Sequence, residues 1–373
     1  MAGIYLHIPF CRQKCSYCNF YFSVSLKTKD DFINTFLKEI DLNHNYLQQK
    51  DLDSIYFGGG TPSVLSAKEI DLILNKINKY FNLKPDIEIT LEANPDDVNK
   101  EFLSDLKKSG INRFSMGVQS FHDKELKILN RSHNSAKAIE SLNMIKEVGF
   151  KNTNIDLIFG IPGSSMDDWK KNLDTFLKMD IPHLSCYNLT IEPGTIIAHQ
   201  IQTGKINGVD DDLSADMFMY TDELLTKNGF EHYEISNYAK EGKYALHNTN
   251  YWTGIPYLGL GPSAHSFDGN TRQWNIANNR KYIASINKNI IPATIETLTP
   301  DDKFNEYMMT GLRTMWGVNI KEIEKFGDKY LYHFNKNIIK FTGEELILKN
   351  EDNYKLSSRG MLYADRIASE LFI

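Results

Sequence analysis

Residues 3–18 read GIYLHIPFCRQKCSYC, a short apolar run followed at once by three closely spaced cysteines. The branched and aromatic side chains of the first six positions predict a β-strand over residues 3–8. Cys11, Cys15 and Cys18 then place three thiols in the loop after that strand. In parallel α/β folds, ligand sites lie in the loops at the carboxyl ends of the strands. Further strands should therefore end at the same edge.

Five more short apolar or alternating runs, each followed by a helical pattern, predict a parallel sheet. These strands are expected at residues 54–57, 87–92, 113–118, 154–159 and 183–189. Apolar residues three and four apart predict helices over 32–40 and 70–77, and Ser66 and Glu69 form a capping box before the second. Gly110 and Gly149 are expected near helix C-termini. Regular strand-helix units joined by right-handed crossovers favour a partial (β/α)6 barrel over an open doubly wound sheet.

The pattern changes near Thr299, which predicts a second unit. A helix is expected over 301–315, a hairpin between 346–349 and 354–356, and a last helix from about Ser358. We interpret 1–298 as the barrel with the segment that follows it, and 299–373 as a small α+β domain of winged-helix type.

The composition is that of an ordinary soluble globular chain. The 373 residues include 42 Lys and Arg against 48 Asp and Glu, a formal net charge of −6. A dedicated nucleic-acid binder would need clustered basic residues, so no nucleic-acid partner is expected. No run approaches the roughly 18 apolar residues of a membrane span, and the first residues lack the basic region of a secretory signal. These features predict a cytoplasmic protein, whose clustered cysteines hold metal rather than form disulfides.

Three cysteines in one tight loop can ligate three irons of a 4Fe-4S cluster and leave the fourth iron open to another ligand. The alternative is a structural zinc site, which needs a fourth protein ligand such as His7. Cys186 falls inside the sixth predicted strand, where we expect a small core residue rather than a further ligand.

The Cx3Cx2C spacing after a first strand resembles the radical S-adenosylmethionine (SAM) superfamily. Four segments resemble, more narrowly, the oxygen-independent coproporphyrinogen III oxidase family. They are HIPFC at 7–11, YFGGGTP at 56–62, SMGVQS at 115–120 and NIDLIFGIPG at 154–163. The resemblance implies that SAM binds the open iron, and that an electron from the cluster splits SAM to a 5'-deoxyadenosyl radical.

The resemblance also implies which side chains contact SAM. Glycines would allow close backbone approach, carboxylates suit the sulfonium, amine and ribose hydroxyls, and an arginine suits the carboxylate. The implied contacts are Tyr5, Tyr17, Gly59, Gly60, Thr61, Glu92, Gln119, Arg131 and Asp156. The alternative interpretation is that the glycines form a tight turn and the carboxylates cap helices or form ion pairs.

Two features favour the heme chaperone branch of this family over its oxidases. Catalytic members carry a fourth cysteine two residues after the third, where this chain has Phe20, and they carry a longer amino-terminal arm. HNTNYW at 247–252 resembles the His-Asn-x-x-Tyr-Trp motif of the chaperones. The resemblance makes His247 and Tyr251 candidates for binding heme, because histidine ligates heme iron and aromatic rings stack on porphyrins. Alternatively, His247 forms a hydrogen bond within a loop and Tyr251 fills the core.

The predicted function is binding heme and transferring it to acceptor proteins, on a scaffold that holds a 4Fe-4S cluster and SAM. The alternatives are coproporphyrinogen III oxidation and a non-catalytic zinc-binding barrel. The expected partners are heme, a heme-accepting protein and an electron donor. Membrane proteins are one class of expected acceptor. A homodimer is compatible with this prediction.

Overall fold

The computed structural model describes residues 1–373 and contains a twelve-stranded curved sheet, with six parallel strands at its centre. The six central strands are β1 (Gly3–Ile8), β2 (Asp51–Gly59), β3 (Asn82–Ala93), β4 (Arg113–Gln119), β5 (Asn152–Phe159) and β6 (His183–Asn188). The flanking strands are β7 (Phe230–Glu234), β8 (Asn237–Lys240), β9 (Tyr257–Leu260), β10 (His265–Phe267), β11 (Thr271–Asn275) and β12 (Ala293–Thr297). Of the flanking strands, β9 also runs parallel to its neighbour, β1. The sheet order is β12-β11-β10-β9-β1-β2-β3-β4-β5-β6-β8-β7.

The parallel strands lie in chain order, as expected for successive crossovers in one direction. β1 pairs with β9 and β6 pairs with β8, so β1 and β6 do not meet and the barrel stays open. The predicted α/β class and partial barrel are therefore confirmed. β2 and β3 begin earlier than predicted, at Asp51 and Asn82, because these two polar residues pair with each other beyond the apolar core of each strand.

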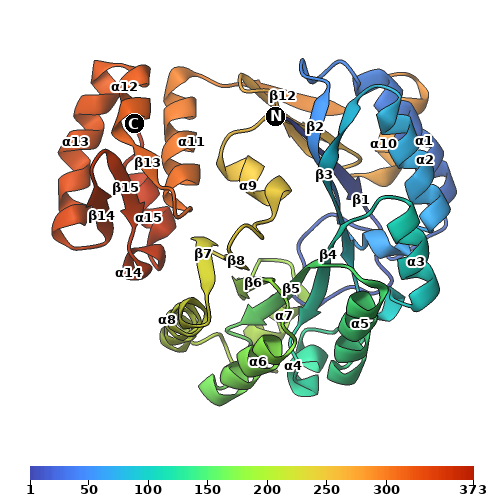
Figure 1. The fold of residues 1–373 in the computed structure, drawn as a ribbon, viewed down its shortest axis with the longest axis horizontal. Helices are drawn as coiled ribbons and strands as arrows, with labels where there is room; N and C mark the ends of the chain where they lie inside the picture. Colours follow the sequence, from blue (N-terminus) through green and yellow to red (C-terminus); the bar gives the residue numbers. More distant parts are fainter.

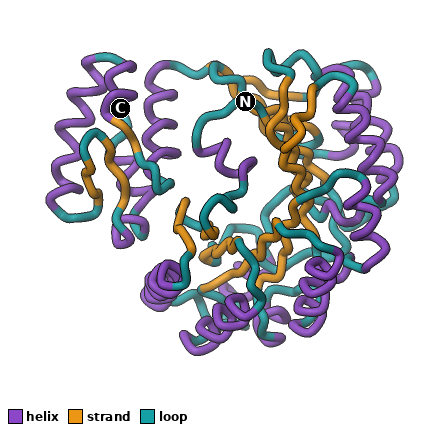
Figure 2. The backbone as a smooth tube through the Cα atoms, in the orientation of Figure 1, coloured by secondary structure: helices purple, strands orange, loops and turns teal.

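The helices of the barrel lie mainly on the outer side of the curved sheet (Figures 1 and 2). They are α1 (Lys29–Asn43), η1 (Pro62–Val64), α2 (Ala67–Asn78), η2 (Pro95–Asp97), α3 (Lys100–Lys108), α4 (Asp123–Ile128), α5 (Ser135–Val148), α6 (Met166–Lys178), α7 (Ile196–Gln202), α8 (Asp211–Lys227), α9 (Leu246–Trp252) and α10 (Asn279–Asn287). The capping box of Ser66 and Glu69 starts α2, and Gly149 ends α5 in the left-handed conformation, both as predicted. By contrast, α9 lies on the inner side of the sheet (Figure 1).

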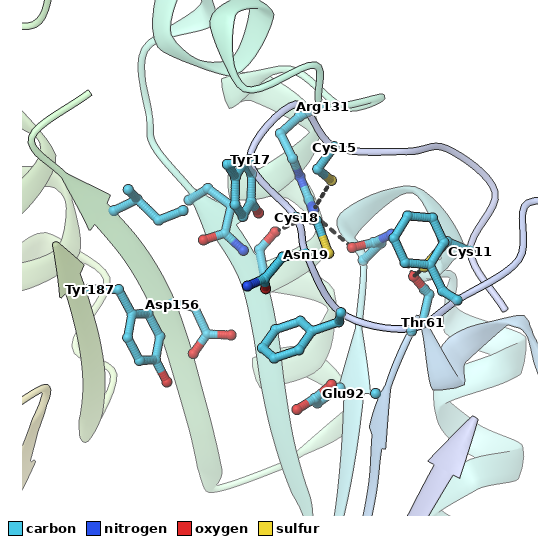
Figure 3. A pocket seen from close by; sticks show the side chains of 18 of the residues that line it. Cys11, Cys15, Tyr17, Cys18, Asn19, Thr61, Glu92, Arg131, Asp156 and Tyr187 are labelled. Atoms are coloured by element: carbon cyan, nitrogen blue, oxygen red, sulfur yellow. Dashed lines mark hydrogen bonds between the residues drawn. The ribbon is translucent and has the colours of Figure 1, made fainter. Parts of the chain in front are cut away.

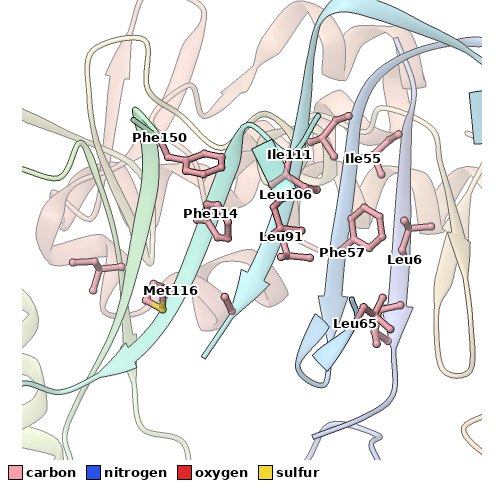
Figure 4. Packing of buried hydrophobic residues seen from close by; sticks show 14 of the residues in the cluster. Leu6, Ile55, Phe57, Leu65, Leu91, Leu106, Ile111, Phe114, Met116 and Phe150 are labelled. Atoms are coloured by element: carbon pink, nitrogen blue, oxygen red, sulfur yellow. The ribbon is translucent and has the colours of Figure 1, made fainter. Parts of the chain in front are cut away.

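Alternation along the strands separates an apolar outer face from a polar inner face. In β1, Ile4, Leu6 and Ile8 are fully buried, whereas the neighbouring Tyr5 and His7 point to the other side. The outward side chains of β1–β4 form one layer with residues of the helices (Figure 4). Burying each such side chain contributes roughly 1.5–3 kcal/mol, so this layer holds the helices against the sheet.

The inner face carries a buried polar network that the sequence analysis did not predict. Nδ2 of Asn154 donates to Oγ of Ser115 at 2.8 Å, and Oδ1 of Asn154 accepts from Nδ1 of His183 at 2.6 Å. Oγ of Ser185 donates to Oδ1 of Asn237 at 2.7 Å. Because a buried polar group without a partner is costly, the network fixes the side chains that face the barrel interior.

The C-terminal residues form a small α+β unit with its own hydrophobic core of Phe304, Phe334 and neighbouring side chains. Its elements are α11 (Pro300–Leu312), β13 (Val318–Asn319), α12 (Ile320–Phe326), α13 (Asp328–Gly343), β14 (Ile347–Asn350), β15 (Asn353–Leu356), α14 (Ser358–Met361) and α15 (Ala364–Glu370). The predicted hairpin is present as β14 and β15. The boundary at residue 299 stays a prediction.

One predicted helix end in this unit is wrong. α11 ends at Leu312 rather than at 315, because Arg313 and Thr314 turn toward the barrel, where the carbonyl of Arg313 accepts from N–H of Ile235 and Thr314 bridges Glu234. The last helix begins at Ser358 but is broken into α14 and α15.

Candidate functional site

A cavity of about 450 Å³ opens at the carboxyl ends of the parallel strands, beside the three cysteines (Figure 3). It is lined by the three cysteines and by all but one of the residues that the sequence implied as SAM contacts. Its lining includes Cys11, Cys15, Tyr17, Cys18, Gly59, Gly60, Thr61, Glu92, Gln119, Arg131 and Asp156. Of the implied SAM contacts, Tyr5 alone lies outside this cavity. It faces the barrel interior and stacks on Tyr56, with ring centroids 6.2 Å apart.

The cysteine loop is held by backbone hydrogen bonds to other parts of the chain. N–H of Cys11 donates to the carbonyl of Ser23 at 3.0 Å, and Ser16 donates through N–H and Oγ to the carbonyls of Leu129 and Ile128. Oγ1 of Thr61 donates to Sγ of Cys11 at 3.4 Å. These contacts fix the position of the cysteine loop relative to the strands.

The donor set fits an iron-sulfur cluster better than a single zinc ion. No three His, Cys, Asp or Glu side chains are arranged to hold one metal ion. His7, the fourth ligand that a zinc site would need, donates from Nε2 to the carbonyl of Tyr21 at 3.0 Å and accepts at Nδ1 from Tyr5 at 3.2 Å. A cubane places a separate iron at each corner, so its three thiols need not converge on one point. Burial raises the pKa of the Cys11 thiol to about 12, so a bound metal would have to favour its ionised form.

Gly59, the last residue of β2, and Gly60, which follows it, have a structural role that their sequence pattern does not reveal. A Cβ at Gly60 would lie 2.6 Å from the carbonyl oxygen of Phe10 and 2.7 Å from that of Ile8. Gly59 has φ +101°, a conformation that other residues rarely adopt. Gly60 therefore lies close to the backbone that leads into the cysteine loop. There, N–H of Gly60 donates to the carbonyl of Ile8, and N–H of Thr61 donates to the carbonyl of Phe10.

Glu92 and Asp156 place two half-buried carboxylates in the cavity, and neither has a Lys or Arg partner within salt-bridge distance. Glu92 accepts from the Tyr56 hydroxyl at 2.7 Å, and Asp156 accepts from Nδ2 of Asn154 at 2.6 Å. Burial is the main cause that raises the pKa of Glu92 to about 7 and raises that of Asp156. Such carboxylates suit a ligand that carries positive charge.

Arg131 connects the cysteine loop to the ends of β3 and β4. It donates to Sγ of Cys15 at 3.2 Å, to Oδ1 of Asn94 at 2.6 Å and to the carbonyl of Gly117 at 2.7 Å. Its Nε is buried and has no partner. This unpaired donor leaves room for an acceptor on a ligand. Gln119, at the end of β4, has φ +69°, and such strained residues concentrate at functional sites.

His247 and Tyr251 lie on α9, not in the loop that the sequence suggested. His247 is 2% exposed, and both ring nitrogens are used: Nδ1 bonds Oγ of Ser54 at 2.8 Å and Nε2 bonds the Tyr251 hydroxyl at 2.9 Å. Burial lowers the pKa of His247 to about 3. Heme ligation by His247 stays a prediction, and it would require breaking one of these bonds.

A second cavity, of about 1030 Å³, lies between the barrel and α11. It shares Phe20, Gly59 and Glu92 with the cysteine cavity, so the two are neighbours. No local sequence pattern predicts this cavity, because its walls come from segments more than 200 residues apart. None of the helices of the chain is both long and apolar enough to cross a membrane.

The model of the radical SAM superfamily matches residues 5–176, which include the cysteine loop and most of the strands that line its cavity, and the HemN C-terminal domain model matches residues 298–363. The heme chaperone HemW of Bacillus subtilis (strain 168) is 34% identical over 98% of both chains. HemW of Haemophilus influenzae is also 34% identical, over 100% of this chain and 97% of that protein. The chain belongs to the HemW heme chaperone family.

Among solved structures, coproporphyrinogen III oxidase (HemN) from Escherichia coli superposes with a TM-score of 0.86. The superposition covers 100% of this chain and 90% of the oxidase, and the two sequences are 23% identical. This likeness establishes a shared fold.

Proposed function

We propose that this protein binds heme and transfers it to acceptor proteins, with a 4Fe-4S cluster on Cys11, Cys15 and Cys18 and SAM beside it. The observation that carries the proposal is the adjacency of the two cavities, which share walls at Gly59 and Glu92. One cavity has the thiols for a cluster, and the other has the size and aromatic lining for a porphyrin. The family name of the relatives supports the assignment of heme as the cargo.

The chain's own residues give each cofactor a place. The three thiols would hold the cluster, and Arg131 donates a hydrogen bond to Sγ of Cys15 at 3.2 Å, which positions this ligand. Glu92 and Asp156 would attract the sulfonium and amino groups of SAM, with Tyr17, Gly59, Gly60, Thr61 and Gln119 completing the walls. When both are bound, the 4Fe-4S cluster and SAM together supply one-electron chemistry.

Heme would occupy the larger cavity, where Tyr251 and Trp252 form part of the wall. At about 1030 Å³ the cavity lies at the upper end of the roughly 300–1,000 Å³ of ordinary small-molecule pockets, which is large enough for a porphyrin macrocycle. His247, the ligand predicted from the sequence motif, lies behind Tyr251 and remains a candidate. Three free thiols in one loop fit a reducing compartment such as the cytoplasm.

Phe20 distinguishes this proposal from porphyrinogen oxidation. It takes the place of the fourth cysteine of the oxidases, is 70% exposed and lines both cavities. A phenylalanine cannot ligate metal there, but it can contact a porphyrin face. The other proposed partners are a heme acceptor and an electron donor. Membrane proteins are one class of proposed acceptor.

Anaerobic reconstitution followed by hemin titration tests the proposal. We expect about four irons and four sulfides per chain, saturable one-to-one hemin binding, and transfer of that hemin to apomyoglobin used as a probe acceptor. Absence of saturable binding would refute the chaperone function. Turnover of coproporphyrinogen III to protoporphyrinogen with SAM and a reductant would favour the oxidase instead. A reconstituted protein that contains zinc but no sulfide would rule out the 4Fe-4S cluster.

A further inference from the structure

The larger cavity contains a histidine that forms no hydrogen bond through its side chain. The inference below rests on the proposed function, because it concerns where the heme iron is held. Two histidines line this cavity, His7 and His265. Both nitrogens of His7 are occupied, by Tyr5 and by the carbonyl of Tyr21. His265 is exposed, its ring lies 6.0 Å from that of Trp274, and neither of its nitrogens bonds another group of the chain.

The strand register places His265 at the end of an aromatic row. On β10, His265 and Phe267 are two residues apart and therefore share a face. Phe267 pairs directly with Tyr257 of β9 on one side and with Arg272 of β11 on the other. The ring centroids of Tyr257 and Phe267 are 6.5 Å apart, and the Arg272 guanidinium lies 5.9 Å from the Phe267 ring. This row offers a porphyrin an apolar face with a nitrogen donor at one end.

Two cations on the same walls suit the propionates of heme. Arg272 pairs with Glu306 at 2.8 Å through Nη2, while its Nε is buried without a partner. Nζ of Lys303 donates to Oδ1 of Asn270 at 2.8 Å, so its other two hydrogens are available. Glu306 also lines the cavity, but its charge is offset by Arg272. The propionates of heme would therefore meet two cations, Arg272 and Lys303, beside one paired carboxylate; the other carboxylate in the lining is Glu92.

His247 is placed less favourably for the same task. It faces a separate polar cavity of about 230 Å³ inside the barrel, and the ring of Tyr251 stands between it and the larger cavity. Its hydrogen bond to Tyr251 instead positions the Tyr251 ring. Partial desolvation of the ring by neighbouring side chains, and then the nearby Arg272, lower the pKa of His265, which favours the neutral imidazole that ligates iron.

We propose that His265 is the axial ligand of heme iron in the cavity between β9–β11 and α11, that Arg272 and Lys303 bind the propionates, and that His247 is a positioning residue that holds Tyr251.

Hemin titration of the His265→Ala variant tests the ligand. We expect this variant to lose roughly tenfold or more in hemin affinity, to lose the Soret and electron paramagnetic resonance signature of an imidazole-ligated iron, and to recover that signature when free imidazole is added. His199→Ala, which removes an exposed histidine on α7 outside the cavity, should match the wild type. His247→Ala should keep the imidazole signature.

The opposite pattern would overturn the inference. If His265→Ala binds hemin with wild-type affinity and spectrum while His247→Ala loses the signature, His247 is the ligand. If the wild type itself binds no hemin, the proposed function fails first and the ligand assignment with it. Equal thermal unfolding of wild type and His265→Ala would show that the exposed residue is not needed for folding.

A second titration separates the propionate contacts from the iron ligand. Arg272→Gln and Lys303→Gln should weaken hemin binding several-fold without changing the imidazole signature. Because hemin dimethyl ester lacks the propionate charges, its affinity should be the same for wild type and both variants. An equal loss for hemin and for its ester would contradict the propionate assignment.

Discussion

The hydroxyl of Thr61 lies 3.4 Å from Sγ of Cys11 and donates a hydrogen bond to it. The contact joins the segment after β2 to the cysteine loop after β1, two segments fifty residues apart in the chain. Both groups are buried, and N–H of Thr61 also donates to the carbonyl of Phe10 at 2.7 Å. Thr61 is thus positioned to adjust the electronic properties of the Cys11 sulfur, the first of the three proposed cluster ligands.

Thr61→Val should lower the reduction potential of the reconstituted cluster. A hydrogen bond to a ligand sulfur stabilises the more negative reduced state, and valine keeps the volume while removing the donor. A redox titration followed by electron paramagnetic resonance measures the potential. Thr90→Val is the control, because the buried Thr90 hydroxyl has no partner. An unchanged potential in Thr61→Val would mean that the hydroxyl serves only the fold of the loop.

Cys15→Ala should abolish the cluster, because two remaining thiolates retain a cubane poorly. Iron and sulfide content and absorption near 400 nm after anaerobic reconstitution measure the loss. Cys186→Ala should keep a full complement, because Cys186 is a buried residue of β6, as the sequence predicted. A full cluster in Cys15→Ala would contradict the ligand assignment.

Glu92→Gln should weaken SAM binding by about tenfold or more while leaving the cluster intact, because hydrogen bonds to charged groups contribute about 1.5–3 kcal/mol. The glutamine oxygen can still accept from Tyr56, which limits the structural effect. In the wild type, SAM affinity should also fall below pH 7, since burial raises the pKa of Glu92 to about 7 and its protonated form loses the negative charge.

Isothermal titration calorimetry under anaerobic conditions measures both effects. The pH dependence should flatten in Glu92→Gln and persist in Glu147→Gln, a variant of an exposed surface pair. Unchanged SAM affinity in Glu92→Gln would identify Glu92 as a structural residue held by Tyr56.

Glu39 should make the free energy of unfolding fall as pH rises from about 4.5 to about 7. This fully buried carboxyl accepts from N–H of Gly261, from Asn275 and from Tyr282, yet burial still raises its pKa to about 7. The folded chain therefore holds a proton that the unfolded chain releases in this interval, and the stabilisation present below pH 4.5 is lost as pH passes 7. The raised pKa corresponds to about 3 kcal/mol at most.

Urea denaturation of wild type and Glu39→Gln at pH 5 and pH 8 measures this dependence. The difference between the two pH values should be smaller in the variant, though Glu92 contributes in the same direction. Glu147→Gln should retain the wild-type difference. Equal differences in wild type and Glu39→Gln would show that Glu39 does not titrate in this range.

The sequence predicted the parallel strands within a few residues, because apolar side chains alternate locally along each one. The capping box at Ser66 and the left-handed cap at Gly149 were also predictable, since each depends on groups a few positions away. The positions of polar groups at the strand ends predicted one common edge, and the cavity beside Cys11 gathers most of them.

What the sequence determined by itself was therefore the barrel, its cysteine loop and the family to which both belong. Tertiary structure alone decided that Gly60 accommodates the backbone of Phe10 and that both nitrogens of His247 are engaged, whereas those of His265 are not. These relationships join segments that are distant in the chain, and no local periodicity records which partners folding brings together.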